Sequence, residues 1–424
     1  MQSRPQNLSR SFRIVSPDHL RPQVEELLRA QGYAFAPEPF APFCYRLQEE
    51  PRPLGSSLAA FFGYVYIQDR SSMLPPLALA PRAGSTVLDM CASPGSKTSL
   101  LAQLVGNGGF VLGNEVNPTR LGTLRANLRQ MNLVQVGTTC HQGEQLPLAP
   151  ATWENIQLDP PCSGWGTADK HPKVMQLWQA EKCQPLIALQ QALLRMAASL
   201  LVPGGRLVYS TCTTNEAENE AQVHFAEDVC GLVREPLAPF ASFRFEDRPG
   251  GEGTLRVDGE QSNAQGFYIA LLSKPLSAAV DTRSAEDAGE ERASKGRDIA
   301  PEKLAGPCFD PKRLPPGRAA LFRDAVRFVP EGAQGLALPW QGALLGKMPG
   351  GNFSPDTRVR CCLPTPQEAP EHSLVLEDTA AISALLAGQS RQTGLSGRQA
   401  GLWWRDLPLG ILALKQGRAL ASFK

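Results

Sequence analysis

The chain has 424 residues, of which 42% are hydrophobic and 20% charged, and its formal net charge is +1. This length exceeds what one ordinary hydrophobic core serves, so we expect two or three globular domains. The net charge gives no overall signal for a polyanionic partner, although residues 305–424 carry 14 Lys and Arg against 9 Asp and Glu. That surplus permits nucleic-acid contact at this end of the chain.

Cysteine usage and hydropathy further narrow the class of protein that the sequence predicts. The ten cysteines form no CxxC pair and no cluster with histidines, so we expect no metal site. No stretch approaches the ~20 apolar residues of a membrane span, and the first residues lack the apolar core of a secretory signal. We therefore expect a cytoplasmic protein with free thiols.

Residues 1–66 are predicted to form a small α+β region. Apolar residues at helical spacing predict an amphipathic helix over residues 19–31, namely Leu20, Val24, Leu27 and Leu28. Short strands are expected on either side of it, at residues 11–15 and 43–47.

Strand-like and helix-like segments alternate from residue 67 to 275, which is typical of an α/β, doubly wound parallel sheet. The expected strands are Ser85–Met90, Phe110–Asn114, Trp153–Leu158, Arg206–Ser210 and Gly266–Leu272. The expected helices are Ser96–Leu104, Arg120–Met131 and Leu186–Leu201, the last of them ended by Pro203-Gly204-Gly205.

The remaining residues divide into two parts. Residues 276–304 mix small and charged side chains with almost no large apolar ones, which predicts a flexible linker. Apolar patterning returns in residues 305–424, where we expect a second, α+β domain with a helix at Leu374–Leu386.

The segment Asp89–Thr98 predicts a ligand-binding turn between the first strand and its helix. Small residues let the backbone approach a ligand closely, but neither GxGxxG nor GxxxxGK[ST] is present, so a pyrophosphate is not indicated. Glu115 ends the second strand, where an acid commonly binds ribose hydroxyls. We expect an adenosine-bearing cofactor, and S-adenosylmethionine is the leading candidate. The alternative is an ordinary α/β turn that binds no cofactor.

Two cysteines follow strands at the sheet edge where α/β proteins place reacting groups. Cys162 comes after the turn Asp159-Pro160-Pro161, and Cys212 ends the next strand. Methylation at C5 of a pyrimidine needs a thiolate that adds to C6, and a group that takes up charge at the ring nitrogen. The alternative is a packing role for both thiols and a turn-capping role for Asp159. We adopt that packing role for the other eight cysteines.

In combination, three segments resemble the signature motifs of the RsmB/NOP family of RNA cytosine-5 methyltransferases, closest to the RsmF branch: Asp89–Thr98, Asp159–Gly166 and Ser210–Thr213. Tyr66–Pro75 and Asn215–Glu220 are further matches, and the resemblance covers residues 10–275. It implies a Rossmann-like S-adenosylmethionine-dependent methyltransferase domain over residues 67–275, preceded by an RNA-binding N-terminal region.

The resemblance also implies roles for single residues. The cysteine matching Cys212 is the nucleophile, the one matching Cys162 assists product release, and Asp159 contacts the cytosine ring. Asp159 and Glu115 would bind S-adenosylmethionine together with the turn residues Cys91, Ala92, Ser93, Pro94, Gly95, Ser96 and Lys97. Gln142 stands where the family usually has an aspartate that contacts the adenine, so we expect weaker or altered cofactor binding.

The ends of the chain resemble the family less closely. Ser383–Gly388 and Trp403–Gly410 are faintly similar to the tail of the RsmF branch. This implies a PUA-like, RNA-contacting domain, with a dimerisation or stabilising domain as the alternative. The helical segment that often precedes Ser11–Ile14 is largely missing, which leaves open which RNA is bound. Candidate phosphate contacts are Arg13, Arg120, Arg125 and Arg129.

The sequence therefore predicts methylation at C5 of a cytosine in RNA, with ribosomal RNA or a small ribosomal subunit as the favoured substrate and with no metal or membrane involved. A transfer-RNA enzyme of the same chemistry is the nearest alternative, because the motifs report the chemistry and not the RNA. A non-catalytic ribosome-assembly factor is another, against which the two cysteines beside Asp159 argue. An amine methyltransferase is a third, although such sites commonly follow the prolines with an aromatic residue instead of Cys162.

Overall fold

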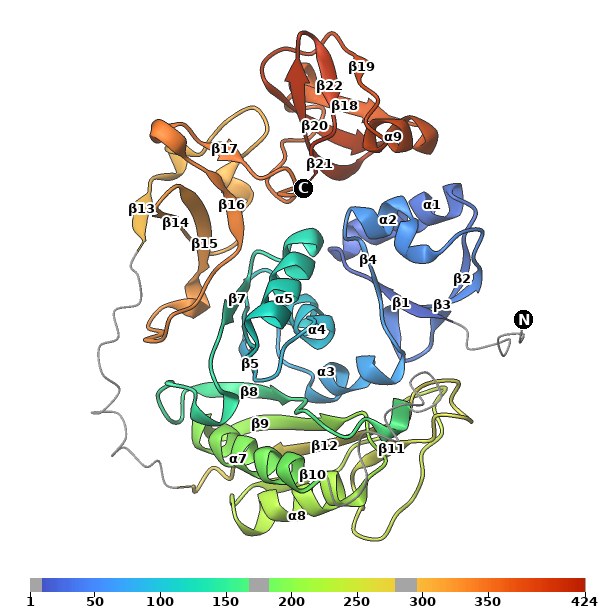
Figure 1. Ribbon diagram of the computed structural model, residues 1–424, viewed down its shortest axis with the longest axis vertical. Coiled ribbons are helices and arrows are strands. Elements are labelled where there is room, and N and C mark those ends of the chain that lie inside the picture. Colours follow the sequence, from blue (N-terminus) through green and yellow to red (C-terminus); the bar gives the residue numbers. More distant parts are fainter. Residues whose placement is uncertain (1–9, 168–182, 279–295, 424) are drawn as a thin grey trace.

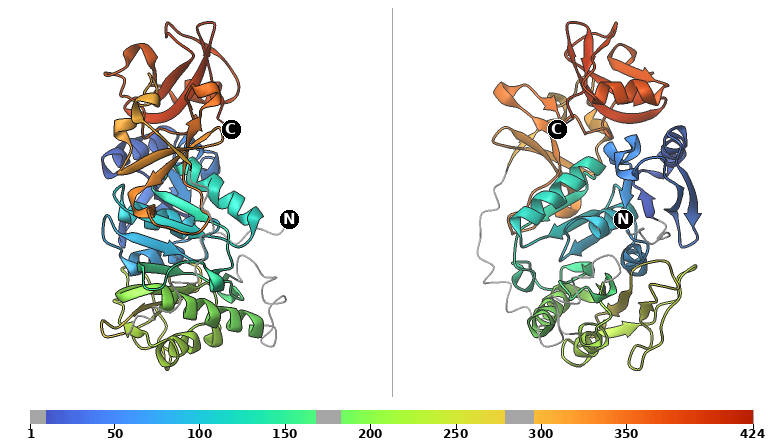
Figure 2. Two further views of the ribbon diagram at one scale, coloured as in Figure 1. Left: turned by 90° about the vertical axis from the view of Figure 1, so that its left-hand side faces the viewer. Right: turned by 45° about the vertical axis from the view of Figure 1, so that its right-hand side comes forward.

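The computed structural model describes residues 10–167, 183–278 and 296–423. Figure 1 shows a central sheet, an N-terminal part beside it and a C-terminal part that extends from the sheet to the top of the view. Figure 2 shows the same arrangement from two further sides. No helix among these residues is long and apolar enough to cross a membrane.

The N-terminal part is a four-stranded antiparallel sheet in the order β2-β3-β1-β4, with two helices. Its elements are β1 (Ser11–Ile14), α1 (Arg21–Ala30), β2 (Ala34–Glu38), β3 (Ala41–Glu49), α2 (Leu58–Phe61) and β4 (Val65–Ile67). The expected helix over residues 19–31 is confirmed as a short 3-10 turn followed by α1, whose apolar face is buried. The two expected strands are β1 and β3.

The central sheet has eight strands, and its order along the main path is β10-β12-β9-β8-β5-β6-β7, with β11 paired to β12. The strands are β5 (Thr86–Asp89), β6 (Phe110–Asn114), β7 (Val136–Thr139), β8 (Trp153–Leu158), β9 (Leu201–Thr211), β10 (Val233–Glu235), β11 (Leu255–Val257) and β12 (Phe267–Ser273). The helices are α3 (Leu74–Leu79), α4 (Ser96–Val105), α5 (Pro118–Met131), α7 (Gln184–Leu200) and α8 (Glu220–Asp228).

The predicted Rossmann-like α/β class is confirmed, and the sheet is mixed. Strands β5 to β9 pair in parallel, whereas β12 pairs antiparallel with β9, β10 and β11 at one edge, and many α/β sheets have such a mixed edge. β5 lies between β6 and β8, so the order of the sheet reverses there, and ligands of open α/β sheets bind at such a point. The Pro203-Gly204-Gly205 run lies inside β9, which begins directly at the end of α7, so its predicted role as a helix terminator is wrong.

Helices cover the two faces of the sheet unequally. Apolar residues of α3, α4 and α5 bury one face, while those of α7 and α8 bury the β8–β9–β12 half of the other. Between β7 and β8 the chain makes only a 3-10 turn, Gly143–Gln145. Ala333, Leu338 and Trp340 of the C-terminal part pack on the face left open by that short connection, with the Trp340 ring 5.9 Å from that of Phe110.

The C-terminal part contains two five-stranded sheets, in the orders β13-β14-β15-β16-β17 and β18-β20-β21-β22-β19. The first consists of β13 (Arg297–Ile299), β14 (Gly317–Phe322), β15 (Ala325–Pro330), β16 (Leu344–Lys347) and β17 (Ser354–Pro355). The second consists of β18 (Ser373–Leu376), β19 (Arg391–Gln392), β20 (Gln399–Trp404), β21 (Leu407–Lys415) and β22 (Arg418–Leu420), with helix α9 (Thr379–Leu386).

Two predictions for this half need correction. The expected helix Leu374–Leu386 is a strand, β18, followed by α9, because the Asp378 side chain caps the helix by accepting a hydrogen bond from the Ala380 backbone. The end of the expected linker is also structured, since β13 pairs with β14. Residues 279–295 of that linker lie outside the described residues.

The second C-terminal sheet and the N-terminal part share one hydrophobic core. The Tyr64 hydroxyl donates to the backbone oxygen of Pro408 across this contact. Arg360, only 7% exposed, donates to the carbonyl oxygens of Gln130 and Met131 at 3.0 and 2.9 Å and lies 4.2 Å from the centre of the Tyr64 ring. The three parts therefore contact one another through buried side chains.

Candidate active site

The segment between β5 and α4 forms a tight turn against β6. The backbone nitrogen of Ala92 donates to the Asn114 carbonyl at 2.8 Å, and Gly95 has a φ of 103°, which favours glycine. A Cβ added to Gly113 would lie 3.0 Å from the Ala92 Cβ, so this packing needs a residue without a side chain in β6. The expected residues Cys91–Ser96 thus lie at the carboxyl end of β5, with Ser96 starting α4.

Carboxyl groups surround this turn. Asp89 is buried and accepts a hydrogen bond from Thr98 Oγ1 at 2.7 Å, and burial raises its pKa to about 7. Burial, together with the negative charges of Asp89, Asp159 and Glu115, raises the pKa of the Cys91 thiol well above its ordinary value. Cys91 is therefore a poor nucleophile, as expected of a packing residue.

Two of the three expected cofactor residues beyond the turn, Glu115 and Gln142, follow β6 and β7. Glu115 directly follows β6 and is 3% exposed, with Oε1 accepting from the Asn117 backbone nitrogen at 2.8 Å. Its Oε2 lies 3.3 Å from an Arg120 nitrogen. Gln142 lies three residues beyond the end of β7, and its side chain is exposed.

The loop after β8 brings Cys162 against Cys212 at the end of β9. Their sulfur atoms are 3.3 Å apart, although the residues are 50 positions apart in sequence. Neighbouring parallel strands end at the same sheet edge, which is why the two loops meet there. The geometry brings the two predicted catalytic thiols into one pair.

The two thiols differ in acidity. A hydrogen bond from Cys162 lowers the pKa of Cys212, whose sulfur is also close to the Lys97 ammonium, while burial and Asp159 act in the opposite direction. The same hydrogen bond raises the pKa of Cys162 well above that of an ordinary thiol, with burial adding to the rise. These opposite shifts favour Cys212 as the thiolate of the pair, the form in which a cysteine is nucleophilic.

Asp159 lies between the turn and the thiols. Lys97 Nζ donates to its Oδ2 at 2.7 Å, and Ser210 Oγ donates to its Oδ1 at 2.9 Å. The Lys97 ammonium also lies 5.1 Å from the centre of the Phe267 ring. One ion pair thus connects the start of α4 with the acidic loop after β8.

Glu218 holds the two cysteine loops together, a role that no motif in the sequence predicts. Its carboxylate, 0% exposed, accepts hydrogen bonds from Ser163 and from residues of two other segments. The donors are Ser163 N (3.0 Å), Ser163 Oγ (2.6 Å), Gln190 Nε2 (3.0 Å) and Asn215 Nδ2 (2.8 Å). Ser163 Oγ also lies 2.7 Å from Thr213 Oγ1, so residues next to both cysteines share one network.

The four arginines expected to contact phosphate have different surroundings. Arg13 is fully buried and donates to Gln68 Oε1, Gln103 Oε1 and Ser99 Oγ, so that prediction is wrong for Arg13. Arg120 pairs with Glu115 and Arg129 with Asp356. Arg125 has a neutral partner, Thr138 Oγ1, at 2.9 Å.

Comparisons with known proteins relate the chain to one family of methyltransferases. The model of a family described as 16S rRNA methyltransferase RsmB/F matches residues 76–273. Proteins named ribosomal RNA small subunit methyltransferase F from Cronobacter sakazakii and Shewanella amazonensis are both 36% identical, over 285 and 278 residues. The matches cover 64% and 63% of this chain and 58% of each relative, so the chain spans less than two thirds of the length of these curated relatives.

A solved structure agrees as well. A methyltransferase homologue from Pyrococcus horikoshii is 31% identical, with a TM-score of 0.56, over 63% of this chain and 87% of that one. The matched family segment contains the whole central sheet from β5 to β12, with the turn, the acidic loop and both thiols.

Proposed function

Because residues 76–273 belong to the RsmB/F methyltransferase family, we propose that the protein methylates C5 of a cytosine in RNA, with small-subunit ribosomal RNA as the substrate. The observation that carries the proposal is the Cys162–Cys212 pair, 3.3 Å apart, beside Asp159. The names of the curated relatives support the choice of RNA.

The cofactor is S-adenosylmethionine, which supplies a methyl group on a sulfonium when bound. The site offers what such a group needs: a close-packed turn over Cys91–Ser96, and Glu115, whose oxygens each keep a free lone pair for a ribose hydroxyl. Gln142 would meet the adenine with an amide. An amide makes only neutral hydrogen bonds, so we expect weaker binding than with an aspartate there.

The thiol pair sets the order of the chemical steps. The Cys212 thiolate adds to C6 of the cytosine, the Sγ–C6 bond forms, and the electron pair displaced from the C5=C6 bond makes C5 nucleophilic. The proton shared by Lys97 and Asp159 is available to the ring nitrogen, which takes up the developing negative charge.

Release reverses the addition after C5 has gained the methyl group. A base takes the C5 proton, the C–H electron pair restores the C5=C6 bond, and the Sγ–C6 bond breaks. The thiol of Cys162 hydrogen-bonds the departing Cys212 thiolate, which makes that sulfur a better leaving group. This division of labour follows from the opposite pKa shifts of the two thiols.

Alanine variants of the two thiols test the proposal. Each variant is incubated with S-adenosylmethionine and small-subunit ribosomal RNA, and denaturing gels are probed for a covalent protein–RNA band. We expect Cys162→Ala to accumulate the band, and Cys212→Ala to give neither band nor 5-methylcytidine. Cys361→Ala, which removes an exposed thiol of the C-terminal part, is the matched control and behaves as the unmodified protein.

The other outcomes are equally informative. The reverse pattern would exchange the two cysteine roles while leaving the reaction in place. Methylation of transfer RNA alone would show that transfer RNA, and not ribosomal RNA, is the substrate. A protein that binds ribosomal RNA but modifies no RNA would overturn the enzymatic proposal in favour of an assembly factor.

A further inference from the structure

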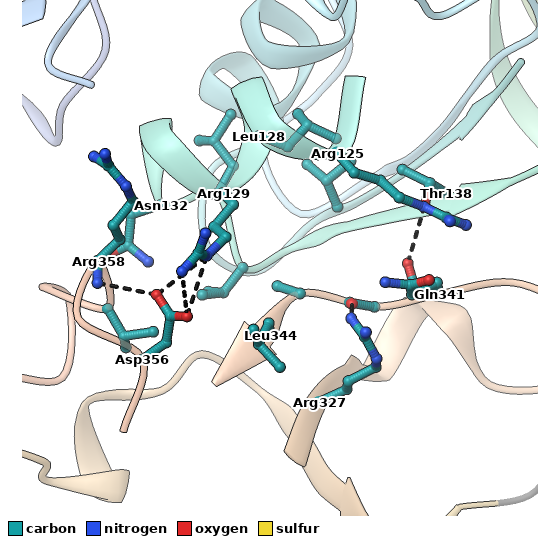
Figure 3. A pocket seen from close by; sticks show the side chains of 16 residues that line it. Arg125, Leu128, Arg129, Asn132, Thr138, Arg327, Gln341, Leu344, Asp356 and Arg358 are labelled. Carbon is teal, nitrogen blue, oxygen red and sulfur yellow. Dashed lines mark hydrogen bonds and ion pairs between the residues drawn. The ribbon is translucent and has the colours of Figure 1, made fainter. Parts of the chain in front are cut away.

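A cavity of about 140 Å³ lies between the methyltransferase sheet and the first C-terminal sheet. Figure 3 shows α5 and β7 on one side of it, and β15, β16 and the residues around Asp356 on the other. Pockets for whole organic ligands usually measure about 300–1,000 Å³. This cavity therefore suits one small group.

The lining of this cavity is strongly positive. It contains one aspartate and four arginines, namely Asp356, Arg125, Arg129, Arg327 and Arg358. Arg129 donates to both carboxylate oxygens of Asp356, at distances from 2.7 to 3.2 Å. This ion pair neutralises the negative charge of Asp356. The other three arginines leave a surplus of three positive charges.

Arg125 and Arg327 line this cavity from its two sides, and neither has an acidic partner in the described ranges. Arg125 Nε donates to Thr138 Oγ1 at 2.9 Å, and an Arg327 nitrogen donates to the Gly342 carbonyl at 3.0 Å. Burial lowers the pKa of Arg327, and the nearby charge of Arg125 lowers it further. Two half-buried like charges repel each other, and an anion between them would relieve that repulsion.

We propose that this cavity binds a backbone phosphate of the RNA substrate, with Arg125 and Arg327 contacting it from two sides. The inference rests on the proposed function and adds to it a phosphate contact away from the reacting base. Planar guanidinium groups match phosphate oxygens in geometry and charge, and each retains unused N–H donors here. Thr138 is one residue from the carboxyl end of β7, the sheet edge that also carries the thiols.

A second cavity favours a nucleotide over a free phosphate ion. It measures about 590 Å³, shares Arg327 with the first, and is lined by Trp340 and Gln334 among others. A space of that size accepts a nucleoside. If the phosphate at Arg327 belongs to a nucleotide, the second cavity has room for the nucleoside. A free phosphate ion would leave that space unused.

The salt dependence of RNA binding tests this inference. The dissociation constant for protein-free small-subunit ribosomal RNA is measured between 0.05 and 0.3 M salt for Arg125→Gln, Arg327→Gln and the double variant, at about five concentrations. One lost phosphate contact reduces the slope of log K against log salt by about 0.7–0.9. Because both arginines contact one phosphate, the double variant should lose about one contact and not two, with affinity about tenfold weaker at 0.15 M salt.

Two further variants act as controls. Arg327→Lys keeps the charge and should retain most of the slope. Arg398→Gln removes one exposed arginine outside the cavity and should leave the affinity within about twofold. Thermal unfolding of every variant, with and without inorganic phosphate, shows whether it is folded and whether it binds the free ion.

The outcomes separate this inference from the proposed function. Unchanged slopes in folded, active variants would overturn the phosphate contact and leave the enzyme assignment intact. Stabilisation by inorganic phosphate that depends on Arg125 and Arg327, with unchanged RNA binding, would overturn the RNA assignment in favour of a free anion. Loss of slope in variants of a protein that methylates no RNA would support the contact while the proposed activity fails.

Discussion

Replacing Glu218 by alanine tests whether this buried carboxylate positions the two thiols. Glu218 is 0% exposed, and the four donors that face it come from three segments of the chain. Removing it leaves Ser163 N and Asn215 Nδ2 without their acceptor, while Ser163 Oγ keeps only Thr213 Oγ1 and Gln190 Nε2 only the Pro161 carbonyl. The loops that carry Cys162 and Cys212 then lose the group that connects them.

The magnitude follows from the number of buried donors. Each hydrogen bond to a charged group contributes about 1.5–3 kcal/mol, and each buried donor left unsatisfied costs about 1–3 kcal/mol. Contributions within one network are not additive, so we expect Glu218→Ala to lose about 4 kcal/mol of unfolding free energy. This loss is smaller than the stability of most domains, about 5–15 kcal/mol, so the variant should still fold.

The assay combines urea unfolding with single-turnover methyl transfer. Ser163→Ala removes one hydroxyl donor and should cost about 1 kcal/mol. Glu227→Ala, on the neighbouring helix α8, is the matched control, because it breaks only the partly exposed ion pair with Arg234 and should cost less than about 1 kcal/mol. For Glu218→Ala we expect the rate to fall by about two orders of magnitude with RNA affinity unchanged, as misplaced reacting groups produce.

Two results would refute this reasoning. The first is an unfolding free energy of Glu218→Ala within about 1 kcal/mol of the unmodified protein, which would mean that water or a rearranged side chain satisfies the donors. The second is a folded Glu218→Ala protein with an unchanged methyl-transfer rate, which would show that the thiol pair forms without this network.

Three other side chains give further predictions. Lys97→Met removes the ammonium that, after the Cys162 hydrogen bond, lowers the Cys212 pKa, so the rising limb of the rate against pH should move to higher pH. Asp89, with a pKa of about 7 in the folded protein against 3.8 ordinarily, holds a proton between pH 4 and 7 that the unfolded chain has lost. Stability should therefore fall by about 2–4 kcal/mol as pH rises across that window in urea unfolding, and Asp89→Asn should abolish the decrease. Arg360→Ala should lower the unfolding free energy by about 3 kcal/mol in the same assay, because buried carbonyl oxygens lose their donors and the Tyr64 ring loses its cation.

Each of these three has a clear contrary result. If Lys97→Met and Lys97→Arg both leave the pH profile unchanged, the Lys97 ammonium does not influence the ionisation of the Cys212 thiol. Equal pH dependence in Asp89→Asn and the unmodified protein would place the titration elsewhere. An Arg360→Ala loss no larger than that of the exposed Arg391→Ala would show that the junction does not depend on this side chain.

The parts of the fold that follow from local sequence were predictable. Strand-like segments of the local sequence identify β6 and β8 at their observed bounds, and the residues after them place Glu115 and Asp159 at the correct edge. Leu374–Leu386 shows the limit of such reasoning, because apolar spacing alone does not separate a strand that runs into a helix from one helix. The cap at Asp378 marks the division, but only once the β18 pairing is known.

Long-range polar contacts were not predictable in this way. Glu218 reaches Ser163, 55 positions away, and Gln190, 28 positions away, and no spacing within the acidic segment indicates either partner. Arg13 was expected at the surface because arginine is rarely fully buried. Its burial depends on acceptors from distant segments, such as Gln103 Oε1 at 3.1 Å, which the local sequence does not contain.

The core shared by the N-terminal part and the second C-terminal sheet has a consequence for biosynthesis. Tyr64 and its partner Pro408 are 344 positions apart, so the N-terminal part emerges long before the strands that complete its core. At translation rates of about 5–20 residues per second, this separation corresponds to about 20–70 s. During that interval apolar side chains of the nascent N-terminal part lack their final cover, and a chaperone that binds hydrophobic segments would find its site there, early in synthesis.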